Sequence, residues 1–115
     1  MASMKNAQEY PIQVLREKLR RQSAGQAAQL SRSVGRLTSY DIQHCLEYRQ
    51  EVDDEYQVFD RLLYAQHCRS SLERCIASGS ARLCYRWQDG RMTDTRFRRT
   101  APGRIRVSGL LAETA

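Results

Sequence analysis

The sequence lacks helix-interrupting residues over its central third, since residues 39–78 contain neither Gly nor Pro. Apolar or half-apolar side chains recur there at alternating spacings of three and four residues, which is the period of one helical stripe. We therefore expect helices to supply the core. The stripe consists of Ile42, Cys45, Val52, Tyr56, Phe59 and Leu63.

Long hydrophobic runs are also missing. No stretch approaches the roughly eighteen apolar residues that a membrane-spanning helix requires, and the N-terminus has no apolar run of the signal-peptide kind. The four cysteines lie within helical or strand patterns, so in a reducing compartment they are most simply buried thiols. These features predict a cytoplasmic protein.

The sequence contains no Gly-rich phosphate loop, no HExxH and no GxSxG motif. Each of its two histidines stands beside a cysteine, but neighbours on a helix point about 100° apart. Neither His-Cys pair therefore forms a nucleophile with its base. We expect no enzymatic activity and no cofactor.

A zinc site is a second hypothesis for the cysteines. Thiolate and imidazole are the ligands that zinc prefers, and His67, Cys68, Cys75 and Cys84 supply both. Their spacing matches no CxxC knuckle, and Cys68 and Cys75 lie two helical turns apart, as two small core residues would. We favour buried thiols without a metal, with zinc binding and a redox role as the alternatives.

The expected fold is mainly α (α+β): a helical bundle or helical hairpin with a long central helix, followed by a C-terminal basic β-hairpin. Residues 11–108 would form one small domain, between a flexible N-terminus at 1–10 and a tail at 109–115. We expect helices at about 11–22, 26–37, 39–65 and 70–78, a hairpin at about 81–98, and a short strand at 104–107.

Four local features set these boundaries. Ser23 to Gly25 interrupts the first helical pattern, and polar Gln66 and Ser70 fall on the apolar stripe, which predicts a break at 65–71. Gly79 is suited to cap the last helix. Asp89-Gly90 predicts a tight hairpin turn that pairs Trp87 with Met92.

Charge is divided unevenly along the chain. Its bases comprise 17 Arg and two Lys, a bias that suits phosphate recognition by planar guanidinium groups but that a GC-rich genome also produces. Residues 1–40 hold seven bases and two acids, residues 41–78 hold four bases and eight acids, and residues 79–115 hold eight bases and three acids. An acidic central region thus separates two basic flanks.

The favoured function is that of a small nucleic-acid-binding regulatory protein, DNA being preferred to RNA, that dimerises through its long helix. Tyr85 and Trp87 could stack on bases, although we favour a place in the core for both. A helix-turn-helix at 24–46 would be one means of DNA binding. Phosphate contacts are assigned to Arg32, Arg36, Arg86, Arg91, Arg96, Arg98 and Arg99, and the dimer interface to Tyr56, Phe59 and Leu63.

The alternative function is that of an adaptor or inhibitor of phage or mobile-element type. Such a protein would dock an acidic or nucleic-acid-binding partner through its charged surfaces. Its acidic residues Asp53, Asp54 and Glu55 are compact enough to compete with nucleic acid for a basic partner.

Overall fold

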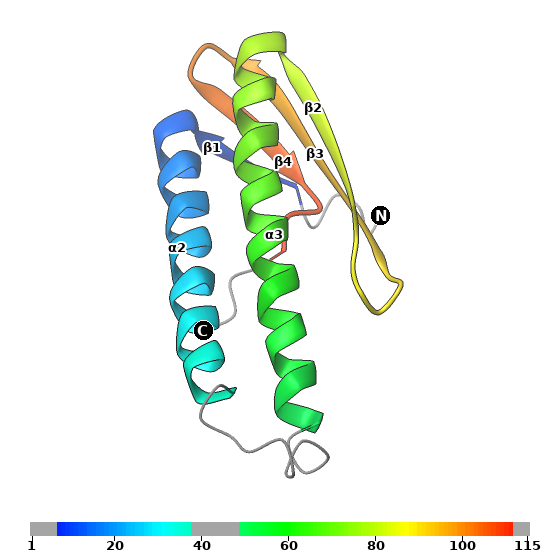
Figure 1. The fold of residues 1–115 in the computed structure, drawn as a ribbon. Coiled ribbons are helices and arrows are strands. Elements are labelled where there is room, and N and C mark those ends of the chain that lie inside the picture. Colours follow the sequence, from blue (N-terminus) through cyan, green and yellow to red (C-terminus); the bar gives the residue numbers. More distant parts are fainter. Residues whose placement is uncertain (1–6, 38–48, 112–115) are drawn as a thin grey trace.

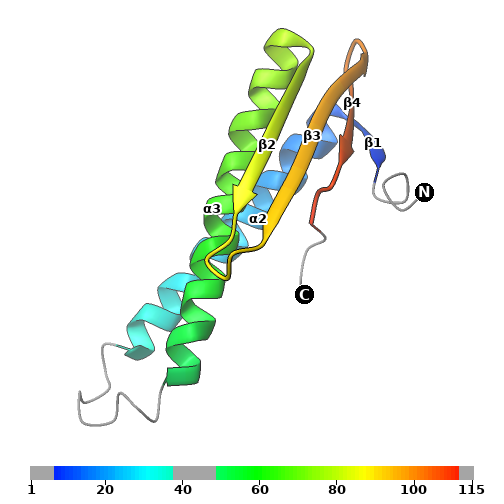
Figure 2. The same ribbon diagram turned by 90° about the vertical axis from the view of Figure 1, so that its right-hand side faces the viewer.

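The computed structural model describes residues 7–37 and 49–111, and the side chains within 7–32 and 57–111. It has two layers: a four-stranded antiparallel sheet, and two antiparallel helices that lie side by side on one face of that sheet (Figures 1 and 2). The elements are β1 (Gln8–Pro11), α2 (Ile12–Leu37), α3 (Arg49–Ser78), β2 (Ser80–Arg86), β3 (Met92–Ala101) and β4 (Arg104–Ser108), with the strand order β1-β4-β3-β2.

The expected mainly α bundle with a long central helix is wrong. The chain forms a mixed α+β fold in which α2 and α3 are of similar length, 26 and 30 residues. A hairpin is present near 81–98, as β2 and β3, but β4 and β1 extend it into a sheet. β1 lies in residues expected to be a flexible end and a helix start, and its Pro11 is tolerated because β1 is an edge strand.

Residues 12–37 form one helix where two were expected. A glycine inside a helix costs about 1 kcal/mol, and Gly25 does not break α2 because the helix packs along α3 and buries Ser23. The helix-turn-helix predicted at 24–46 is helical over 24–37, where it belongs to α2, and its turn stays a prediction. Its remaining part, 38–46, lies outside the described residues.

The break expected at 65–71 does not occur, because α3 runs unbroken to Ser78. Its buried stripe contains Ala65, Cys68, Leu72 and Cys75, which keep the helical spacing of three and four. Gln66 and Ser70, the polar residues that suggested the break, face solvent instead. The first part of the helix expected at 39–65 lies outside the described residues as far as 48.

The core lies between the two layers. Strand side chains alternate between the faces of a sheet, and the inward positions of β2, β3 and β4 carry large apolar or aromatic groups. Tyr64 of α3 meets Tyr85 edge-on with ring centroids 5.5 Å apart and lies 5.2 Å from Trp87. The buried cluster comprises Leu15, Leu19, Tyr64, Cys68, Leu72, Cys75, Tyr85, Trp87, Phe97, Ile105 and Val107.

The hairpin turn is wider than the Asp-Gly pair predicted. Trp87 N donates to Arg91 O at 2.9 Å, and Gly90 N donates to Trp87 O at 3.0 Å. Only Gly90 within this turn has a positive φ, of 92°. The extra residue places Met92 opposite Arg86 and not Trp87, so Met92 faces away from the helices. The predicted pairing of Trp87 with Met92 is wrong.

The packing predicts unequal effects for two truncations on α2. Leu19 is fully buried between the layers, whereas Val14 is 53% exposed. We expect Leu19→Ala to lower the free energy of unfolding by about 2–5 kcal/mol and Val14→Ala to change it by no more than about 0.5 kcal/mol. Urea unfolding followed by circular dichroism measures both, and equal effects would contradict the two-layer packing.

The cysteines provide a second test of the layers. Burial raises the pKa of the Cys68 thiol to about 12 and also raises the pKa of Cys75, so neither forms the reactive thiolate readily. Cys84 is exposed on the face of the sheet that lies away from the helices. In the native protein, N-ethylmaleimide should modify the peptide containing Cys84 first, and those containing Cys68 and Cys75 only after denaturation. Peptide mass mapping gives the order, and early modification of Cys68 would contradict the fold.

Candidate nucleic-acid interface

The face of the sheet that the helices leave uncovered is basic. The strand period that sends aromatic rings inward sends arginines outward, with exposed positions alternating along β2, β3 and β4. We call this surface the open face. It carries Ser80, Arg82, Cys84 and Arg86 of β2, Met92, Asp94, Arg96 and Arg98 of β3, Arg104, Arg106 and Ser108 of β4, and Glu9 and Pro11 of β1.

The register places like charges directly opposite one another. Arg82 lies opposite Arg96 across β2 and β3, and Arg98 lies opposite Arg106 across β3 and β4. Ser80 lies opposite Arg98 on its other side, and Ser108 lies opposite Arg96 in the same way. We call these six residues the arginine grid. They line a shallow hollow of about 500 Å³. Opposed like charges destabilise a sheet, so the grid is a local concentration of positive charge.

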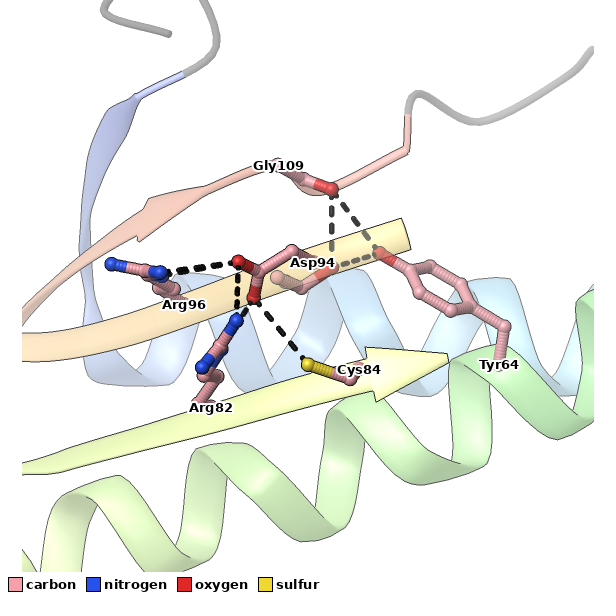
Figure 3. A network of polar contacts seen from close by, with 7 residues as sticks. Tyr64, Arg82, Cys84, Asp94, Arg96 and Gly109 are labelled. Atoms are coloured by element: carbon pink, nitrogen blue, oxygen red, sulfur yellow. Dashed lines mark hydrogen bonds and ion pairs between the residues drawn. The ribbon is translucent and has the colours of Figure 1, made fainter. Parts of the chain in front are cut away.

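Asp94 neutralises part of the grid. The guanidinium of Arg82 donates two hydrogen bonds to its carboxylate, from Nε to Oδ1 at 3.0 Å and from Nη2 to Oδ2 at 3.1 Å. Arg96 Nη2 also lies 3.2 Å from the same Oδ2 (Figure 3). The hydrogen bonds from Arg82, followed by those from Arg96, lower the pKa of Asp94, which is therefore ionised at neutral pH. Cys84 Sγ lies 3.9 Å from Oδ1.

Glu9 neutralises the opposite edge of the open face. It accepts a hydrogen bond from Thr100 and pairs with Arg104 at 3.8 Å. The hydrogen bond from Thr100, and then the charges of Arg104 and Arg106, lower the pKa of Glu9. The six arginines of the open face thus have two carboxylates among them, and within the described residues Arg86, Arg98 and Arg106 form no ion pair.

Buried hydrogen bonds brace the strand beneath Asp94. The next residue, Thr95, points inward, and its hydroxyl lies 2.6 Å from Tyr64 Oη and 3.1 Å from the carbonyl oxygen of Gly109 (Figure 3). Gly109 has a φ of 77°, and a Cβ there would lie 2.2 Å from Asp94 O, so only glycine allows this approach. The sheet therefore presents Asp94 and its neighbours from a fixed backbone.

The helix layer pairs its exposed charges differently. Arg16 of α2 forms an ion pair with Glu73 of α3 at 2.7 Å. Within α2, Glu17 pairs with Arg20 at 2.6 Å and with Arg21 at 3.3 Å. The hydrogen bonds from Arg20 are the main cause that lowers the pKa of Glu17 to about 2. Three arginines of this layer are thus paired within it. The open face differs because its arginines lie directly opposite one another on neighbouring strands, and we therefore take it as the candidate anion site.

Three of the predicted contact residues meet on the open face: Arg86, Arg96 and Arg98. Arg91 lies at the hairpin turn, where it pairs with Asp89 at 2.6 Å and covers the Trp87 ring at 5.8 Å. Arg99 points toward the helix layer and donates to Ile76 O at 2.6 Å, where it satisfies the C-terminal end of α3.

The remaining predicted contacts lie on α2, in the other layer. Arg32 is exposed there, well along the helix from the sheet. Arg36 also belongs to α2, but its side chain lies outside the described set. The structure therefore does not bring either position to the open face.

Three arginines of the open face were absent from the predicted contact set: Arg82, Arg104 and Arg106. Their signal was present as alternation, since Arg82 and Arg86 are an even number of positions apart, as are Arg104 and Arg106. The sequence does not disclose that β4 lies beside β3, and this neighbourhood is what places Arg106 opposite Arg98.

The predicted dimer interface is only partly described. Phe59 is 40% exposed, so it is available for contact with a partner. Leu63 is half-buried and packs against the core of its own chain. The side chain of Tyr56 lies outside the described set, and dimerisation through α3 stays a prediction.

The proposed zinc ligands do not converge. Cys68 and Cys75 point into the core, Cys84 lies on the open face, and His67 is exposed. Among the side chains described at 7–32 and 57–111, no three of the His, Cys, Asp or Glu type are placed to hold a metal ion together. Neither described helix has an apolar stretch long enough to cross a membrane.

Aromatic side chains occupy the buried face of the sheet. Tyr85, Trp87 and Phe97 are all at most 8% exposed, which agrees with the expectation of a core role for Tyr85 and Trp87. In the described part of the chain, the open face therefore offers guanidinium groups and hydroxyls without a ring for base stacking. Such a surface favours contacts to phosphates over contacts to unstacked bases.

Comparison of the chain with protein-family models, with curated proteins and with solved structures finds no match.

Proposed function

We propose that this protein binds nucleic acid, with duplex DNA as the preferred form, by laying the open face of its sheet against the phosphate backbone. The observation that supports the proposal most directly is the arginine grid, in which Arg82 opposes Arg96 and Arg98 opposes Arg106. Such opposed charges are costly in an isolated sheet. A row of phosphates offsets that cost, because guanidinium forks bind phosphate oxygens in pairs.

Spacing also supports a backbone contact. Side chains at alternate positions of a strand are about 6.8 Å apart, and neighbouring strands are about 4.8 Å apart. The grid therefore presents a regular two-dimensional array of positive groups. A duplex needs no base to be unstacked for this kind of contact, which accounts for our preference for duplex over single-stranded ligands. Binding of this kind is largely independent of sequence.

Other parts of the hypothesis stay predictions. A regulatory role and a cytoplasmic location accompany the proposal, because both are usual for a small protein that binds DNA. Dimerisation through α3 would double the number of phosphate contacts. The adaptor alternative would use the Arg-rich hairpin or the acidic residues Asp53, Asp54 and Glu55, whose side chains lie outside the described set.

A salt titration tests the proposal. If four arginines contact phosphates, log K for a fluorescein-labelled duplex should fall with log salt concentration at a slope of about −3 to −4. Fluorescence anisotropy from low to physiological salt gives this slope. Undetectable binding to duplex DNA and duplex RNA at low salt would refute the proposal, and recovery of one stoichiometric protein partner would then favour the adaptor.

Paired substitutions localise the binding. Arg98→Ala combined with Arg106→Ala should lower the affinity about tenfold to thirtyfold and reduce the salt slope by about two. The matched control is Arg20→Ala combined with Arg21→Ala, which removes the same charge from the helix layer. We expect little change in affinity for the control. Equal losses for both pairs would indicate a response to net charge and not to the open face.

A further inference from the structure

The arginine grid contains two pairs that differ in their partners. Arg82 and Arg96 both contact the Asp94 carboxylate, at 3.0 Å and 3.2 Å respectively. Within the described residues, Arg98 and Arg106 form no ion pair, although the charge of Arg106 acts on Glu9 beside it. All four line one hollow. One pair is thus engaged with the protein's own carboxylate, and the other is available.

The contact made by Asp94 has the form of a ligand contact. A guanidinium fork accepts a carboxylate and a phosphate in the same way, through two parallel N–H···O hydrogen bonds. Arg82 makes this bidentate contact with Asp94 while Arg96 adds a bond to the same Oδ2 (Figure 3). Two cationic side chains that converge on one oxyanion would hold a phosphate group equally well.

The engaged pair is also easy to release. The side chains of Arg82, Asp94 and Arg96 are 59%, 41% and 62% exposed. Ion pairs at such exposure contribute little stability and are screened by salt. A phosphate carried by a polyanion can therefore displace the carboxylate at small cost, because the rest of the polyanion is already held at the other pair.

On this basis, and resting on the proposed function, we propose that the open face holds two phosphate subsites, one open and one occupied by a carboxylate of the protein itself. Arg98 and Arg106, with Ser80 beside them, form an open subsite for one backbone phosphate. Arg82 and Arg96, with Ser108 beside them, form a second subsite that Asp94 occupies until a phosphate replaces its carboxylate. Asp94 thereby sets the affinity of the face and disfavours weakly charged ligands.

Replacement of Asp94 tests the second subsite. Asp94→Asn removes the competing charge and keeps the shape of the side chain. We expect affinity for the labelled duplex to rise about fivefold at low salt, the effect of one unit charge at about 4 Å in water. The salt slope should become steeper by about one, because one more positive charge is free to meet a phosphate. Anisotropy titrations at several salt concentrations measure both quantities.

Glu73→Gln is the matched control. Glu73 is also an exposed carboxylate that accepts two hydrogen bonds from one arginine, from Arg16 Nε to Oε2 at 3.0 Å and from Nη2 to Oε1 at 2.7 Å. It lies in the helix layer, away from the open face. Its substitution makes the same change in net charge, and we expect affinity within about twofold of the wild type. An equal gain for both variants would overturn the subsite assignment.

A second pair of variants does not depend on the Asn side chain. In the wild-type background, Arg82→Ala with Arg96→Ala should cost less affinity than Arg98→Ala with Arg106→Ala, because only the first pair must give up a carboxylate. In the Asp94→Asn background, the two double substitutions should cost about the same. Urea unfolding of each variant verifies that the fold is intact. A larger loss from Arg82 and Arg96 in the wild-type background would contradict the proposal.

The two proposals fail differently. If neither the wild type nor any variant binds the duplex at low salt, both the proposed function and the assignment of the subsites are wrong. If the wild type binds but Asp94→Asn brings no gain, only the assignment of the second subsite is wrong. Competition by inorganic tripolyphosphate separates the sources of phosphate: weak competition supports a nucleic-acid backbone, whereas competition as strong as that by unlabelled duplex would overturn the preference for nucleic acid.

Discussion

The packing of α3 against one face of the sheet is the constraint on which the rest of the structure depends. Small residues on α3, among them Cys68 and Cys75, leave room for the large rings of Tyr85, Trp87 and Phe97 on the strands. Alternate residues of a strand point to opposite faces of the sheet, so burying these rings also fixes which residues point outward. A register slip of one residue would bury arginines and expose rings. The basic open face is therefore a consequence of how the core is filled.

The same constraint brings an energetic cost. With the rings turned inward, arginines of neighbouring strands must face one another, as Arg98 and Arg106 do. The fold tolerates them because the core beneath is well anchored, through buried apolar contacts and through the hydrogen bonds that join Tyr64, Thr95 and Gly109. A bound polyanion would remove the repulsion, and a ligand that binds only the folded state stabilises that state. Under the proposed function, binding and folding would thus be coupled through the open face.

Local sequence patterns predicted some elements and missed others for identifiable reasons. The alternation of β2 and the Asp-Gly turn indicated a hairpin, and Gly79 does end α3 with a φ of 100° and a bond from its amide to Cys75 O. The helix break at 65–71 was wrong because the buried stripe continues through Ala65, Cys68, Leu72 and Cys75, while Gln66 and Ser70 face solvent. The break at Ser23 to Gly25 was wrong because packing against α3 outweighs one unfavourable residue. β1 was missed because its pairing energy comes from β4, nearly a hundred residues away.

The sequence by itself determined the chemistry of the surface: arginine in place of lysine, and outward arginines alternating with inward apolar residues in the last third of the chain. It could not determine which arginines act together. Only the tertiary structure placed Arg106 opposite Arg98, gave Asp94 to Arg82 and Arg96, and turned Arg99 toward the end of α3. The physical reason is that period-two alternation assigns a residue to a face, whereas neighbours across a sheet depend on long-range strand pairing and register.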